Sequence, residues 1–172
     1  MNNKKLKEEF IKYFGEEKWN EEEILSVIQS FANYVCESYI GLSPVPVLFD
    51  DLIGEASRYS YEDECIYLNR KYRDDMVELL HSTLHEIEHY FQGKYAYAYE
   101  TPKALRWRKD IESNIGIDEP IRYQLQEIEI DANAFAAVVL SCELGITYIH
   151  PIDLIQVKIE EYISSNKILN DY

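Results

Sequence analysis

Long apolar runs, cysteine motifs and secretory signals are missing from this 172-residue chain. No run approaches the roughly 18 apolar residues that a membrane-spanning helix needs. The segment Met1–Phe10 is charged rather than apolar, so we expect no signal peptide. The three cysteines, Cys36, Cys65 and Cys142, form no Cys-x-x-Cys pair, which indicates reduced thiols rather than a disulfide framework. These features predict a cytoplasmic protein.

Positive charge is also scarce. The chain has 17 lysines and arginines against 32 aspartates and glutamates, and its formal net charge is −15. Such a surface repels nucleic-acid phosphates and anionic lipid headgroups, so we expect neither nucleic-acid binding nor membrane docking. The acidic surface favours solubility and would suit basic partners, although a solvated acidic face is the simpler explanation.

Residues that interrupt helices and strands are few. Only six glycines and five prolines are present, and there is no linker, repeat or low-complexity tract. A composition of 47% hydrophobic and 28% charged residues is that of a soluble globular protein. We therefore expect a single domain over residues 1–172, with N-terminal helices (residues 1–41) as an appendage of the same domain.

Helical periodicity recurs along the chain. Leu6–Phe14 reads as a short amphipathic helix before Gly15. Asn20 and Glu23 form a capping-box signal for a longer helix that ends at Gly41. Four later helices are expected: Tyr72–Gln92, one from Pro102, Pro120–Leu144, and one from Pro151 to about Ser165.

Strands are expected only between these two groups of helices. Val45–Phe49 is a short strand candidate. Glu55–Tyr61 and Cys65–Asn69 flank the polar turn Glu62-Asp63-Glu64 and read as a hairpin. The expected class is α+β, a mostly helical domain with a small sheet of about three strands packed on the Tyr72–Gln92 helix.

The most informative segment is His85-Glu86-Ile87-Glu88-His89, within the expected Tyr72–Gln92 helix. Residues four apart share a helix face, so the two imidazoles project side by side and can hold one zinc ion. Glu86 stands beside the first histidine, where its carboxylate can reach a water on the same metal. The pattern therefore predicts a zinc site that needs a third protein ligand.

Glu129, in the expected Pro120–Leu144 helix, is the predicted third ligand. A carboxylate from a second helix would complete a His₂Glu set and leave the fourth position for water. Asn133, four residues on, shares its face and could orient a ligating histidine. Glu127 and Asp131 would make the same pair on another face, and spacing does not separate the two registers.

Three segments resemble, in order, those of a zincin metallopeptidase with a glutamate third ligand, closest to the ImmA/IrrE-like group. They are Ile66–Asn69 for the strand before the active-site helix, Leu84–His89 for the zinc-binding helix, and Glu129–Ala136 for the group's E-x-x-A-N/D-x-F-A segment. The resemblance covers roughly Val45 to Leu144, and it implies that Glu129 is the ligand.

The resemblance implies a zinc-dependent peptidase that acts on a protein or peptide. Glu86 would be the general base that takes a proton from metal-activated water. Relatives of this kind cleave transcriptional repressors, so a regulatory protein is an expected substrate. Glu88 departs from the group, which often has glycine there. The alternative is a catalytically silent interaction module that keeps the fold and still binds metal.

Groups around the expected site are less determined. A second cationic or phenolic group would stabilise the oxyanion. The sequence does not choose among five candidates: Tyr95, Tyr97, Tyr99, Tyr123 and His150.

Other residues near the expected site are open to more than one interpretation. His81, four residues before His85, is expected to be a core or supporting histidine rather than a ligand. The alternating Tyr95–Tyr99 segment indicates either an aromatic wall beside a cleft or a packed extended segment. A substrate peptide would add as a strand along one edge of the Glu55–Asn69 hairpin. Cys65–Asn69 is the favoured edge because it leads directly into the histidine helix, although either strand could be outermost.

Overall fold

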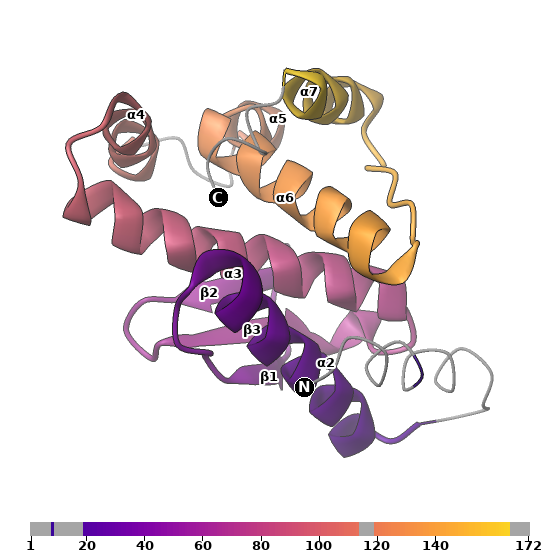
Figure 1. The fold of residues 1–172 in the computed structure, drawn as a ribbon. Coiled ribbons are helices and arrows are strands. Elements are labelled where there is room, and N and C mark those ends of the chain that lie inside the picture. Colours follow the sequence, from indigo (N-terminus) through magenta and orange to yellow (C-terminus); the bar gives the residue numbers. More distant parts are fainter. Residues whose placement is uncertain (1–7, 9–18, 114–118, 166–172) are drawn as a thin grey trace.

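The computed structural model describes residues 8, 19–113 and 119–165. Except for Glu8, the helix expected over Leu6–Phe14 falls outside this part of the chain. The described residues form an α+β fold with a three-stranded sheet, which confirms the expected class (Figure 1). Among these residues, none of the helices combines the length and apolar character that crossing a bilayer requires.

The helices and strands follow one another along the chain with short connections. They are α2 (Glu21–Val35), a π-helical turn (Cys36–Ile40), β1 (Val47–Asp50), β2 (Ser57–Ser60), β3 (Cys65–Asn69), a 3₁₀ turn (Arg70–Tyr72), α3 (Met76–Ala98), α4 (Pro102–Ile111), α5 (Pro120–Gln124), α6 (Glu127–Leu144) and α7 (Asp153–Ser164). Helix α3 runs between the sheet and α2 on one side and α6 on the other (Figure 1).

The start of α2 follows the sequence prediction. The Asn20 side chain accepts a hydrogen bond from the Glu23 backbone N–H, and Glu23 accepts one from the Asn20 N–H. This reciprocal capping box satisfies two backbone donors that a helix start leaves free. After the π-helical turn, Gly41 ends the helical run with a positive φ of 66°, a backbone conformation that glycine adopts at little cost.

The order of the sheet is β1-β3-β2. Strand β3 pairs with β1 in parallel, with Val47 opposite Ile66, and with β2 antiparallel, with Tyr59 opposite Ile66. The prediction that Cys65–Asn69 forms the sheet edge is therefore wrong. It fails because β1 pairs with the far edge of β3, and the Val47 N–H at the start of β1 donates to Gln29 of α2 (2.8 Å). Of the two hairpin strands, β2 is the outer one.

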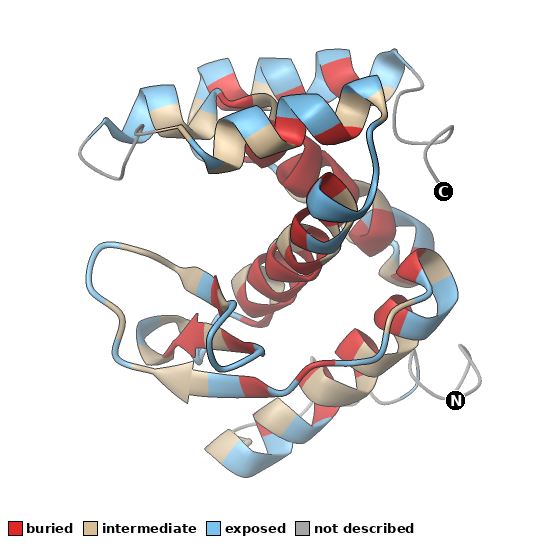
Figure 2. Ribbon diagram, turned by 90° about the vertical axis from the view of Figure 1, so that its left-hand side faces the viewer, coloured by how far each residue is buried: buried red, intermediate tan, exposed pale blue. Residues whose placement is uncertain are grey.

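Helix α3 is the central element of the core. Buried residues occur on most of its turns (Figure 2). It contacts α6, a helix in which the small residues Ala132 and Ala136 are both 0% exposed. Side chains that α3 directs toward α6 therefore face a second helix at short range, which is the arrangement that a shared site needs.

Helix α3 begins later and ends later than expected. The 3₁₀ turn precedes it, and Asp75 caps it by accepting from the Glu78 N–H. Its last turns include Tyr95 and Ala96, so the extended alternative for the Tyr95–Tyr99 segment is wrong. Ring contacts explain why, because Tyr95 packs on Phe91 (5.6 Å) and on Trp107 of α4 (5.6 Å) with helical spacing.

The expected Pro120–Leu144 helix is two helices, α5 and α6, and this prediction is also wrong. Gln126 lies between them in an extended conformation, and its side chain donates to Ser113 Oγ (2.8 Å). Asp110 of α4 accepts from the Ile128 N–H (3.2 Å) and so caps α6. A cap from a distant segment leaves no local sequence signal, which is why the break was not expected.

Candidate metal centre

The structure brings His85, His89 and Glu129 together between α3 and α6. The two Nε2 atoms of the histidines lie 2.9 Å apart. The Glu129 carboxylate reaches both, with Oε2 at 3.3 Å from His85 Nε2 and Oε1 at 3.2 Å from His89 Nε2. Among the described residues, this trio is the group of histidine, cysteine and acidic side chains whose ligand atoms converge closely enough to hold one metal ion.

The distances within this trio fit a metal ion. A tetrahedral zinc ion with bonds of about 2.0–2.1 Å to nitrogen and oxygen places its ligand atoms about 3.3 Å from one another. The three separations here are 2.9, 3.2 and 3.3 Å. Three protein ligands leave a fourth position for water or substrate. Imidazole and carboxylate also suit other divalent transition metals, so the trio indicates a metal of this class rather than zinc alone.

The electrostatics of the trio are compatible with a bound cation. Burial lowers the pKa of His89, but the adjacent Glu129 carboxylate outweighs burial and raises it to about 10. Burial raises the pKa of Glu129, and the two histidines outweigh it and hold that pKa well below its usual range. A buried carboxylate therefore stays charged at this position, and it is held by positive charge that a metal ion can replace.

The rival register of α6 does not reach the trio. Glu127 lies on another face and pairs with Arg106 (2.9 Å). Asp131 faces α3, where it accepts from Gln92 Nε2 (3.2 Å) and lies 3.6 Å from Lys103 Nζ. The geometry therefore favours Glu129, with Asp131 as a supporting residue behind the trio.

The residue that orients His89 is Gln92, which the sequence analysis missed. His89 Nδ1 lies 2.7 Å from Gln92 Oε1, and Gln92 is fully buried. Asn133, predicted for this role, instead donates its amide to the carbonyl of Glu129 (2.8 Å). The available signal was spacing, because Gln92 is three residues after His89 and shares its helix face.

Glu86 lies beside the trio and is tied to the outer strand β2. Ser57 Oγ donates to Glu86 Oε1 (2.7 Å), and the Tyr59 backbone N–H donates to Glu86 Oε2 (2.7 Å). Each carboxylate oxygen has a second lone pair, so Glu86 can still accept a proton from a third group. The carboxylate is thus held in place at the border between the sheet edge and the trio.

A cleft of about 920 Å³, which we call the central cleft, opens over the trio. Its walls include β2, the trio, Glu86 and the segment that follows α6. Of the five candidates for oxyanion stabilisation, Tyr123 and His150 line it. The exposed Tyr97 and Tyr99 lie further along α3 and at its end, outside the described lining.

Tyr123 and His150 differ in what they can donate. Burial and the nearby Glu129 carboxylate raise the pKa of Tyr123 far above its usual range, so its hydroxyl keeps its proton. Burial lowers the pKa of His150, and its Nδ1 accepts from the Ile152 N–H (3.1 Å). Because Nδ1 of a neutral His150 accepts a hydrogen bond, the proton of the ring is on Nε2, and Nε2 is the nitrogen that can donate.

His81 lies outside the trio, as expected. Its ring stacks on Tyr148 at 3.6 Å, and its centroid is 6.3 Å from that of His85. Burial lowers the pKa of His81 well below its usual value, which keeps the ring neutral. His81 also lines the central cleft.

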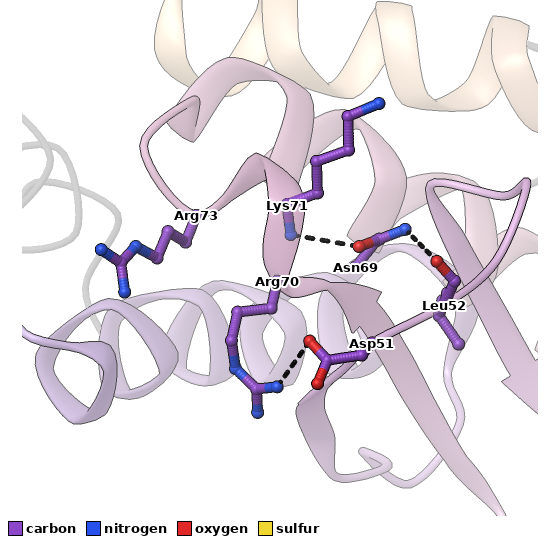
Figure 3. A pocket seen from close by; sticks show the side chains of 6 residues that line it. All are labelled: Asp51, Leu52, Asn69, Arg70, Lys71 and Arg73. Atoms are coloured by element: carbon purple, nitrogen blue, oxygen red, sulfur yellow. Dashed lines mark hydrogen bonds and ion pairs between the residues drawn. The ribbon is translucent and has the colours of Figure 1, made fainter.

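A second hollow, of about 380 Å³, lies beside the end of β3 (Figure 3). Two guanidinium groups line it: Arg70 pairs with Glu21 (2.7 Å) and Asp51 (2.8 Å), and Arg73 pairs with Asp74 (3.7 Å). The Asn69 amide donates to the carbonyls of Leu52 and Glu55. Because these polar groups bind one another, the hollow reads as a structural junction between α2 and the sheet.

No protein-family model matches this chain, and no curated protein or solved structure is similar to it at a significant level. A function for the protein therefore has to be argued from the geometry of the trio and the central cleft.

Proposed function

We propose that the protein is a zinc-dependent peptidase of the zincin type, similar to the ImmA/IrrE-like group, that hydrolyses a protein or peptide. The observation that carries this proposal is the convergence of His85, His89 and Glu129 beside the Glu86 carboxylate, at the floor of an open cleft. A buried trio of ligands without a cleft would suit a structural metal site. A cleft that reaches the trio suits catalysis on a bound substrate.

The reaction needs a proton carrier at a defined place. A zinc ion held by the trio would supply a water with its pKa lowered towards about 7 and would polarise the scissile carbonyl. Glu86 accepts the proton of the attacking water and passes it to the leaving amine. Ser57 and the Tyr59 N–H keep the carboxylate of Glu86 oriented while it does so.

Tyr123 is the group best suited to stabilise the negative charge that develops on the substrate carbonyl oxygen. It lines the central cleft beside Glu129, and its hydroxyl keeps its proton. A preorganised hydroxyl donor in a partly buried site strengthens as charge develops, which is the requirement for catalysis. His150 is the alternative donor in the same cleft.

The free edge of the outer strand β2 is the proposed binding surface for an extended substrate. Ala56 O accepts from Asn69 N, so alternate residues of β2 pair with β3. The backbone groups of Ser57 and Tyr59 point the other way, and the Tyr59 N–H already reaches Glu86. A peptide added along this edge would pair with the Ser57 backbone and the Tyr59 carbonyl, in the same cleft as the trio, with its side chains alternating between pockets and solvent. A regulatory protein with an exposed extended segment is the proposed substrate class.

The first test combines metal content with hydrolysis. The protein should hold about one zinc per chain, and His85→Ala and His89→Ala should each remove it. The zinc-loaded parent should cleave a peptide library made by digesting a cell extract, while both variants should leave it intact. A parent that holds zinc and cleaves nothing would favour the silent interaction module instead.

A further inference from the structure

One end of the central cleft is formed by residues that the proposed chemistry does not use. Glu78, His81 and Ser82 lie on the first turns of α3, one and two turns before His85 on the same face. Tyr72 precedes α3, and Tyr148 follows α6. We call these five residues the Glu78 subsite. All five line the cleft, and the subsite therefore adjoins the trio directly.

The Glu78 carboxylate is half-buried, and among the described residues no lysine or arginine pairs with it. It accepts from the Tyr148 hydroxyl (3.3 Å) and from Ser82 Oγ (3.5 Å), both long hydrogen bonds. Burial is the largest effect and raises the pKa of Glu78, and the neighbouring Asp75 acts in the same direction. The hydrogen bonds from Tyr148 and Ser82 and the nearby His85 act against it. A carboxylate placed in this way gains from a positive charge supplied by a ligand.

His81 provides an independent sign of a missing ligand. Its side chain is 5% exposed, and its Nε2 atom has no hydrogen-bond partner among the described residues. Buried polar atoms are almost always paired in folded proteins, so the unpaired Nε2 of this cleft-lining residue leaves a hydrogen bond that a bound group can complete. The ring cannot turn away freely, because it stacks on Tyr148 at 3.6 Å.

The other carboxylates of the cleft are already occupied. Glu55 pairs with Arg58 (3.5 Å), and Asp110 caps α6 at Ile128. Glu86 and Glu129 belong to the proposed catalytic centre. Among the described acidic residues of the cleft, Glu78 is therefore the one that forms no ion pair with lysine or arginine, does not belong to the trio or the proposed general base, and does not cap a helix. Its place in the first turn of α3 favours the charged carboxylate, so the group is available to a cation in the cleft.

We propose that the Glu78 subsite binds the cationic side chain, lysine or arginine, of a substrate residue next to the scissile bond. The proposal rests on the proposed peptidase function and narrows its substrate to basic peptides. The ammonium or guanidinium group donates to Glu78 and to His81 Nε2. Its alkyl stem packs between the rings of Tyr72 and Tyr148. The net charge of −15 attracts such peptides to the cleft from a distance.

The test uses two peptide hydroxamates that differ at one residue, lysine in one and its uncharged isostere norleucine in the other. Both bind zinc through the hydroxamate, so binding to the zinc-loaded protein does not require catalysis. Calorimetry should show that the lysine compound binds on the order of tenfold or more tightly, as expected for a charge-assisted hydrogen bond. Glu78→Gln should abolish this preference while zinc content and unfolding temperature stay unchanged.

Glu55→Gln is the matched control, because it removes a cleft carboxylate that is already paired with Arg58. This variant should keep the preference for lysine. Equal binding of the two compounds by the parent protein, or an unchanged preference in Glu78→Gln, would overturn the subsite.

The same compounds separate this proposal from the proposed function. A lysine preference that depends on Glu78, in a protein that cleaves no peptide, would retain the subsite and refute the peptidase. Cleavage of a peptide library with no excess of lysine or arginine beside the cut would retain the peptidase and refute the subsite. If neither hydroxamate binds the zinc-loaded protein, both proposals fail.

Discussion

His89 Nδ1 lies 2.7 Å from Gln92 Oε1, one turn further along α3. The amide nitrogen of Gln92 donates to the carbonyl of Ile128 (3.0 Å) and to Asp131 (3.2 Å), which fixes the orientation of the amide. Its oxygen must then accept from the histidine, so the proton of neutral His89 resides on Nδ1. In this tautomer the lone pair of Nε2 is free and points towards His85 and Glu129. A metal ion requires this tautomer.

Gln92→Leu should lower zinc affinity about 10–100-fold, because the ring of His89 loses the partner that sets its tautomer and orientation. Competition with a chelating dye measures the change. Gln29→Leu is the control, since it removes a glutamine that hydrogen-bonds β1 far from the trio. It should lower stability and leave zinc affinity unchanged. Equal affinity of Gln92→Leu and the parent would show that the contact has no orienting role.

Glu129→Gln should weaken zinc binding far more than Glu127→Gln. Glu129 reaches both histidines, whereas Glu127 pairs with Arg106 on another face of α6. The two variants make the same chemical change two positions apart, so metal content measured after dialysis compares the registers directly. The reverse ordering would place Glu127 at the metal and remove the geometric basis of the site.

Zinc affinity should rise with pH. Without metal, Glu129 raises the pKa of His89 to about 10, so near neutral pH the ring is positively charged, with a proton on both nitrogens. Zinc must displace that proton, and the apparent affinity should therefore increase about tenfold per pH unit between about pH 6.5 and 8.5. Calorimetry in two buffers of different ionisation enthalpy should also detect the released proton. An affinity that is independent of pH would contradict this protonation state.

Tyr123→Phe should lower the rate of peptide hydrolysis about 10²–10³-fold while zinc content stays unchanged, as expected for loss of one oxyanion donor. Tyr97→Phe is the matched control, because Tyr97 is 59% exposed and lies outside the described cleft lining. The measurement is the initial rate on a peptide identified as a substrate. If Tyr123→Phe retains full activity, His150 becomes the candidate donor.

The parts of the fold that local signals specify were predictable from the sequence. The α2 capping box, the hairpin strands and the histidine spacing all depend on residues close together in the chain. The class, α+β with a small sheet, follows from these segments. The placement of Glu129 opposite the two histidines also agrees with the geometry, because it required only one further helix with the correct face.

The parts that depend on distant contacts were not predictable. Strand β3 is central because β1 pairs with it in parallel, and α5 separates from α6 because Asp110 caps α6 from another helix. Gln92 orients His89 only because Ile128 fixes its amide. Each relationship joins segments far apart in sequence, and neither hydrophobic period nor residue type records such a contact.

The most direct test of a zinc peptidase centred on His85, His89 and Glu129 is hydrolysis by Glu86→Gln at matched zinc content. Glutamine keeps an oxygen to accept from the Tyr59 N–H or from Ser57, and it leaves the trio intact, so fold and metal should persist. It cannot accept the proton of the attacking water, and cleavage of a proteome-derived peptide library should fall by orders of magnitude. Cleavage as fast as that of the parent, with zinc bound in both, would contradict the assignment of Glu86 as general base.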